Sequence, residues 1–146
     1  MTGPRTLTGM TSPPSPSIAE PLLTDHDVLR RVGDLVGPAL RNGTLWLLFV
    51  DGDRYQAPVV MPIDDTPRLP DGMIVGLGEV IEGFLPDIAT AAGPGSVVFV
   101  RERLGPDVVT PDDRAWAEAL TAMCRSRDIA LDGVHLATPG GARRLP

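Results

Sequence analysis

The stretch LWLLFVDGDRYQAPVVMP, residues 45–62, decides the fold. In it an apolar run is followed by Asp-Gly at positions 51–52 and then by a second strand-like run. An Asp-Gly pair between two such runs is a strong hairpin signal, because glycine accepts the positive φ of a primed turn. Pro58 and Pro62 cannot donate to a sheet ladder, so the second strand is expected to lie at a sheet edge or to end early.

The segment before the hairpin is expected to hold a tail and one helix. Residues 1–22 are rich in proline, serine and threonine and cannot bury enough apolar surface to offset the entropy of ordering, so we predict a disordered tail. Thr24 and Asp27 then have the spacing of a capping box, and apolar residues follow with helical period. Pro38 and Gly43 are expected to close this first helix.

After the hairpin the pattern predicts helix, strand, helix and strand. The first of these helices is expected to kink at Pro86 and to stop at residues 93–95. Its apolar face is assigned to Val80, Ile81, Phe84, Leu85, Ile88 and Ala92. The run 96–100 is typical of a buried strand. The next helix begins at Thr110, with Pro111 at its first position and Asp113 three residues after the cap, and residues 129–137 form the last strand.

These elements together predict an α/β domain over residues 23–139. Its order is α-β-β-α-β-α-β, and a hairpin followed by strand–helix–strand implies a single mixed β-sheet with flanking helices. Residues 140–146 are rich in glycine and arginine and are expected to be a flexible C-terminal tail.

Charge and cysteine content narrow the classes of function. The chain of 146 residues has a net charge of −6, which argues against nucleic acid and against an anionic membrane surface as partners. Cys124 is the single cysteine, so an intrachain disulfide or a multi-cysteine zinc site cannot form. A reducing, cytoplasmic location is therefore expected, with Cys124 as a core thiol on the buried face of its helix.

The second half of the chain carries a family resemblance. A strand at Val97–Val100 leads into the loop 101–105, a helix start follows at 110–113, and a further strand lies at 129–135. With the hairpin upstream, this order and spacing resembles the RadC-like branch of the JAB/MPN metalloprotease-fold family, over roughly residues 43–138. The resemblance implies a three-layer fold like that of the cytidine deaminases. In that family two histidines and an aspartate bind zinc, and a glutamate near the start of the hairpin activates the bound water.

The residues at the family's zinc positions do not match. Arg101 and Arg103 occupy the two histidine positions, and arginine stays protonated and has no lone pair to give to a metal. Asp113 matches the metal aspartate if Thr110 replaces the family's helix-capping serine. If Pro111 is instead paired with the family's proline, Ala115 takes that place and the third ligand is lost as well.

The general base is missing too, because the expected glutamate position offers only Asn42, Gly43 and Thr44. We therefore expect no catalytic residue, no metal and no cofactor. The resemblance then favours a non-catalytic JAB/MPN-like module that acts by binding a protein partner. The alternative is a small-ligand (anion) binding protein, or an enzyme, that reuses the pocket near Arg101, Arg103 and Asp113. A homodimer formed through the hairpin edge is a third hypothesis, weakened by the prolines of that edge.

The arrangement of these three side chains is left open by the sequence. Arg101 or Arg103 can pair with Asp113 and put a fixed positive charge where the metal would be, or all three side chains can point into water. A metal trio of Asp112, Asp113 and His135 is the less favoured interpretation of the nearby histidine, which is expected to be a satisfied or solvent-facing residue of its strand.

Overall fold

The computed structural model describes residues 20–146, so most of the tail expected at residues 1–22 lies outside the described part of the chain. The end of that segment does not behave as a tail. Leu22 is buried, and its backbone N–H donates to the carbonyl oxygen of Arg54 at 2.7 Å. The ordered domain therefore begins before residue 23, because an apolar side chain at position 22 belongs to its core.

The centre of the fold is one five-stranded mixed sheet with the strand order β2-β1-β3-β4-β5. Strands β3 and β4 are parallel, and the other neighbouring pairs are antiparallel. This confirms the predicted α/β class with a single mixed sheet. The strands are β1 (Thr44–Val50), β2 (Gln56–Ile63), β3 (Ser96–Glu102), β4 (Ala130–Thr138) and β5 (Gly141–Arg144).

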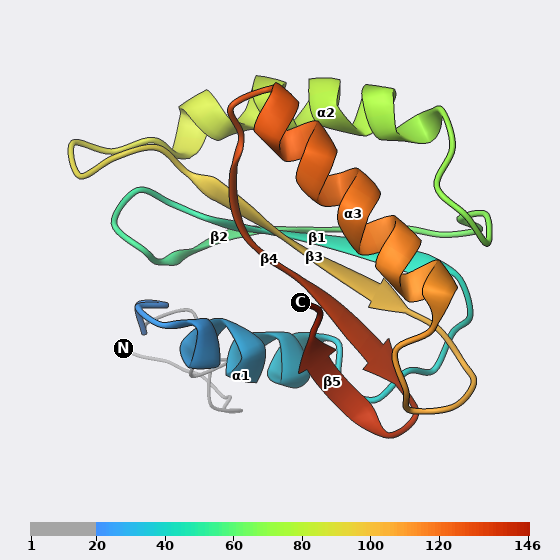
Figure 1. The fold of residues 1–146 in the computed structure, drawn as a ribbon. Coiled ribbons are helices and arrows are strands. Elements are labelled where there is room, and N and C mark those ends of the chain that lie inside the picture. The colour runs from blue at the N-terminus through green and yellow to red at the C-terminus, as the bar shows by residue number, and fades with distance from the viewer. Residues whose placement is uncertain (1–19) are drawn as a thin grey trace.

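Helices cover both faces of the sheet and make a three-layer arrangement (Figure 1). One face carries α2 (Met73–Phe84) and α3 (Pro111–Ser126), and the other carries α1 (Asp25–Leu35). Both predicted helix starts are confirmed. Thr24 and Thr110 are N-caps with complete capping boxes, in which the third residue of each helix returns a carboxylate to the cap backbone.

Strand β3 is the central strand of the sheet and contributes side chains to the hydrophobic cores on both of its faces. All its residues are buried, since successive side chains point to opposite faces and both faces are covered. Val97 and Phe99 join the core under α2 and α3, whereas Val98 and Val100 join the core under α1. The same alternation determines where the polar residues at the end of this strand project.

The edge position of β2 is confirmed, because β2 pairs only with β1 among the described strands. The turn before it differs from the prediction. Residues 51–55 connect the strands, and the positive φ falls on Arg54, at 75°, instead of on Gly52. The Asp51 carboxylate accepts the backbone N–H groups of Asp53 and Tyr55, each at 2.9 Å, and this closes the longer turn.

The helix before β3 also ends differently. Helix α2 stops at Phe84, and Pro86 lies in a short 3-10 helix, η1 (Leu85–Ile88), so the proline terminates the helix and does not kink it. The assignment of Val80 to the buried face was wrong, since its side chain is 53% exposed. In the described part of the chain, no helix combines the length and apolarity needed to cross a bilayer.

The prediction of a flexible C-terminal tail over residues 140–146 was wrong. Residues 141–144 form β5, which pairs antiparallel with β4. Two ion pairs hold this strand: Arg143 Nη2 lies 2.9 Å from Asp107 Oδ1, and Arg144 Nη1 lies 2.7 Å from Asp25 Oδ1. The element order thus gains a final strand that the polar sequence of this segment does not indicate.

Candidate functional site

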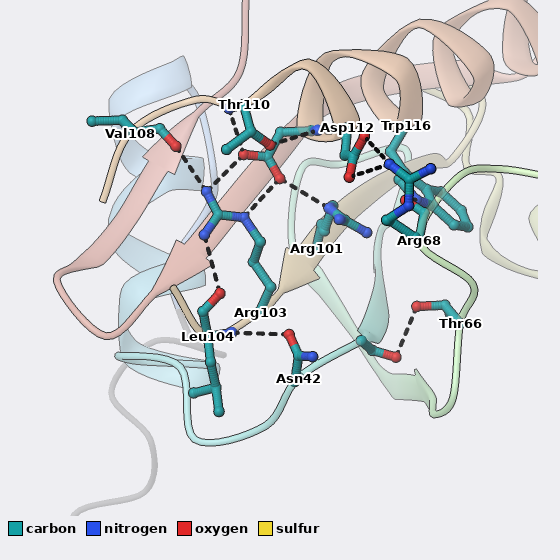
Figure 2. Close-up of polar contacts among 12 residues, drawn as sticks. Asn42, Thr66, Arg68, Arg101, Arg103, Leu104, Val108, Thr110, Asp112 and Trp116 are labelled. Carbon is teal, nitrogen blue, oxygen red and sulfur yellow. Dashed lines mark hydrogen bonds and ion pairs between the residues drawn. The ribbon is translucent and has the colours of Figure 1, made fainter. Parts of the chain in front are cut away.

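The site is built where the end of β3 meets the start of α3. Arg101 and Arg103 are two residues apart, so they project from β3 and its continuation toward the same face of the sheet. Helix α3 begins above that face and brings Asp113 over the strand through its third helical position. Figure 2 shows the two guanidinium groups meeting the helix start.

Asp113 lies at the centre of the cluster and has no solvent exposure. Its Oδ1 accepts from Arg101 Nε at 3.0 Å and from Arg103 Nε at 2.8 Å, and its Oδ2 accepts from Arg103 Nη2 at 2.8 Å and from the Thr110 backbone N–H at 2.9 Å. Burial raises the pKa of this carboxyl, but the hydrogen bonds from Arg103, Thr110 and Arg101 outweigh it and hold the pKa well below its ordinary value of 3.8. Asp113 is therefore ionised and fully engaged.

Arg103 is a structural residue, because each nitrogen of its guanidinium group has a partner. Besides its bonds to Asp113, its Nη1 donates to the carbonyl oxygens of Leu104 and Pro106 at 3.2 and 3.0 Å, and its Nη2 donates to that of Val108 at 2.7 Å. The hydrogen bonds to Asp113 raise the pKa of Arg103. The side chain ties the loop between β3 and α3 to the helix start and has little donor capacity left for a ligand.

Arg101 is different, because only its Nε has a partner. Arg101 is 7% exposed, and its Cζ lies over the Trp116 ring at 5.7 Å from the ring centre, which is within the range of a cation–π interaction. Within residues 20–146 its two terminal nitrogens donate to no other group. In Figure 2 they point away from the carboxylate of Asp113, on the side of Arg68.

These nitrogens face a pocket of about 350 Å³ between the end of β3, the loop before β1 and the loop after β2. Arg68 stands at its rim and binds both carboxylate oxygens of Asp112 at 3.0 Å. The Thr66 hydroxyl donates to the Gly43 carbonyl oxygen at 2.8 Å and joins the two loops. The pocket is lined by Asn42, Gly43, Thr66, Pro67, Arg68, Arg101, Arg103 and Asp112.

The charges around this pocket do not balance. Arg101 and Arg103 share the single carboxylate of Asp113, and the side-chain exposures of the three groups are 9%, 8% and 0%. At the rim, Arg68 and Asp112 neutralise each other. On the pocket side of the sheet, Arg101, Arg103 and Asp113 therefore carry one positive charge in excess, while the buried carboxylate of Glu102 lies on the opposite side. Since a buried unpaired charge is costly, this excess is the main electrostatic feature of the site.

The structure brings together the three residues that the sequence singled out and confirms that Arg101 and Arg103 both pair with Asp113. Thr110 is the N-cap of α3, and Asp113 completes its capping box. The structure does not bring the less favoured trio of Asp112, Asp113 and His135 together: among the described residues no group of three His, Cys, Asp or Glu side chains is placed to hold a metal ion.

His135 lies on the α1 side of the sheet, since Val134 and Leu136 on either side of it pack in the core under α2 and α3. It has no solvent exposure, and neither ring nitrogen has a hydrogen-bond partner among the described residues. Burial, together with the charge of Arg144, lowers its pKa to about 4 from the ordinary 6.5. The expectation of a solvent-facing histidine was therefore wrong.

Sequence reasoning missed Glu102, the neighbour of the two arginines. Its side chain points to the opposite face of the sheet and is buried. Its Oε2 accepts the backbone N–H groups of Leu40 and Arg41 at 2.8 and 3.1 Å, and its Oε1 accepts from Trp46 Nε1 at 2.9 Å. Glu102 thus fixes the loop that leads to Asn42 and one wall of the pocket. A carboxylate at the end of a buried strand was the available signal.

Comparison of the chain with protein-family models, with curated proteins and with solved structures gave no match.

Proposed function

We propose that this domain is a non-catalytic module with a JAB/MPN-like fold that acts by binding a protein partner at the Arg101 pocket. The observation that carries the proposal is the pairing of Arg101 and Arg103 with one buried carboxylate, Asp113. It places fixed guanidinium groups where the resemblance expects zinc ligands. Such groups stabilise the fold and bind anions, but they cannot activate water.

The position of the pocket supports the JAB/MPN-like interpretation. Asn42, at the place where the resemblance expects the general base, lines the same pocket as Arg101 and Arg103. Asp113, at the place of the metal aspartate, lies beneath them. Residues separated by about 60 positions thus meet at one pocket.

The chemistry of the lining supports a binding role without catalysis. A general base needs a free lone pair and a pKa near the working pH. Asp113 is buried under three charged or backbone donors with a lowered pKa, and Asp112 is paired with Arg68. Neither carboxylate is available to take a proton from a substrate.

Exposed apolar side chains near the pocket favour a protein as the partner. Leu40, Leu69 and Leu104 are 85%, 42% and 48% exposed, and each lies within two positions of a residue that lines the pocket. Protein interfaces combine apolar contacts of this kind with a few placed polar groups. A free small anion would leave these side chains uncovered.

The partner proposal is tested with two matched variants, Leu104→Ser beside the pocket and Val80→Ser on α2. The two wild-type side chains have similar exposure, 48% and 53%, so the variants remove similar apolar surface at different places. Proteins that the wild-type domain retains from the source lysate are purified, and their affinity for the three forms is measured by calorimetry. We expect Leu104→Ser alone to weaken one defined complex; equal binding by all three forms would contradict the proposal.

The non-catalytic proposal has its own test. Excess zinc is added to the purified domain, and the melting temperature is measured with and without the metal. A ligand that binds only the folded state raises the melting temperature. Since we propose that the domain has no zinc site, we expect the melting temperature to stay unchanged. Stabilisation by several kcal/mol at saturating zinc would overturn this part of the proposal. Sedimentation at two concentrations shows in the same samples whether a second copy of the chain is the partner.

A further inference from the structure

We infer that the Arg101 pocket binds one carboxylate group of the partner, held end-on by the two terminal nitrogens of Arg101. The inference rests on the proposed function and assigns the chemistry by which that surface recognises its partner. It also separates Arg101 from Arg103, whose donors are already used inside the domain.

The geometry of Arg101 fits a planar, two-oxygen ligand. Its Nε donates to Asp113 Oδ1 at 3.0 Å, and its Cζ lies over the Trp116 ring at 5.7 Å, so two contacts restrain the guanidinium group. The free edge between the two terminal nitrogens then has one direction, into the pocket (Figure 2). A fixed guanidinium edge makes two parallel hydrogen bonds to a carboxylate with little further loss of side-chain entropy.

Other donors of the pocket have capacity for the same ligand. The Asn42 Oδ1 accepts the backbone N–H of Leu104 at 3.2 Å, which leaves the amide –NH₂ of Asn42 as a donor at the pocket wall. Arg68 uses its Nη1 for Asp112, and within residues 20–146 its Nε and Nη2 make no hydrogen bond. Donors from three separate segments therefore border one cavity, as expected for an anion site.

On the pocket side of the sheet, the charge favours a ligand with a single negative charge. Arg101, Arg103 and Asp113 together have one positive charge in excess, which one carboxylate cancels. Within residues 20–146 the terminal nitrogens of Arg101 have no protein partner, so a carboxylate can bind them and cancel the net charge of these three groups at the same time. A phosphate group carries about −1.5 to −2 charges near neutral pH, which exceeds the charge of the site in a chain whose net charge is already −6.

The experiment uses the whole chain and defined probes. Binding is followed by the NMR signals of the Arg101 Nε–H and the Trp116 indole N–H during titration with acetate, inorganic phosphate, the peptide acetyl-Leu-Asp-Leu-amide and its neutral isostere acetyl-Leu-Asn-Leu-amide. We expect saturable shifts with acetate, tighter binding of the Asp peptide because its leucines cover the apolar rim, weaker binding of phosphate, and no response to the Asn peptide.

The matched variants are Arg101→Lys and Arg125→Lys. Lysine keeps the charge at position 101 but loses the two-pronged edge, so affinity for the Asp peptide is expected to fall about tenfold or more. Arg125 is exposed in the last turn of α3, and its variant should bind as the wild type does. The melting temperature of Arg101→Lys verifies that the variant domain is folded.

Three results would overturn the inference: no saturable response to either carboxylate probe, equal affinity in Arg101→Lys, or tighter binding of phosphate than of the Asp peptide. Failure of the inference differs from failure of the proposed function. If the affinity of a partner falls in Leu104→Ser and is unchanged in Arg101→Lys, only the carboxylate assignment is removed. If the pocket binds the Asp peptide but no partner protein is found, only the proposed function is removed.

Discussion

Replacing Asp113 by asparagine removes the shared counter-charge of Arg101 and Arg103 while keeping the size of the side chain. Both guanidinium groups are more than nine-tenths buried, so neither gains full solvation in compensation. Breaking a buried pair by removing one partner costs about 3–5 kcal/mol. The loss of the helix-capping interaction with Thr110 acts in the same direction. This cost is a large part of the roughly 5–15 kcal/mol by which a domain is stable.

The free energy of unfolding is measured by urea titration, with tryptophan fluorescence as the signal. Asp112→Asn is the matched control, because it is the same chemical change one residue earlier, where the partner Arg68 is largely exposed and the carboxylate is only partly buried. An exposed pair contributes about 0–1 kcal/mol. We expect Asp113→Asn to lower the free energy of unfolding by several times the effect of Asp112→Asn. Equal and small effects in the two variants would refute the view that the cluster stabilises the domain.

The pH dependence gives a second measure of the same residue. The pKa of Asp113 is lower in the folded state than in the unfolded state, where it is near its ordinary value of 3.8. Its stabilising contribution is therefore complete above that value and is lost progressively as the pH falls below it. In Asp113→Asn this part of the acid destabilisation should be absent.

Two further predictions concern the opposite face of the sheet. The pKa of His135 is about 4 in the folded state against 6.5 in the unfolded state, so stability should be complete above 6.5 and should fall by about 3 kcal/mol as the pH decreases to 4. Urea titrations at a series of pH values measure this slope, and a His135→Phe variant that kept the full slope would exclude His135 as its source. Replacing Glu102 by glutamine puts an amide –NH₂ against N–H donors and should cost about 1–3 kcal/mol, with a change in Trp46 fluorescence. Glu118→Gln on the exposed side of α3 is the control, and equal stability of the two variants would contradict the role of Glu102.

Signals that depend on a few neighbouring residues were sufficient for much of the fold. The capping boxes at Thr24 and Thr110 and the prolines at positions 58 and 62 identified two helix starts and an edge strand correctly. Each of these features follows from the backbone chemistry of residues close in sequence, and no distant contact is needed to specify it.

Features that depend on distant partners were not predictable. The left-handed conformation of Arg54 is held by its bonds to the Leu22 carbonyl oxygen and to the Asp132 carboxylate, at 2.8 and 2.7 Å. Strand β5 has no apolar alternation, and its partners Asp107 and Asp25 lie far away in the sequence. In both places contacts with residues distant in sequence determine the backbone conformation, and the local sequence pattern does not indicate these contacts.

For the candidate site, the sequence indicated the three charged residues but not their separate roles. The hydrogen-bond donors of Arg103 are used mainly by the backbone carbonyl oxygens of residues 104, 106 and 108. The positions of carbonyl groups cannot be predicted from side-chain types. The free edge of Arg101 and the wall formed by Asn42 likewise depend on how two loops fold against the end of β3.

The sharing of one carboxylate by two arginines has a consequence for the history of the chain. A substitution that neutralises position 113 leaves two buried positive charges, and a substitution at 101 or 103 alone changes the charge around an acid that cannot reach water. Drift at any one position therefore selects for compensatory substitution at the others. We therefore expect positions 101, 103 and 113 to change together, if they change at all, while the surrounding loops vary independently.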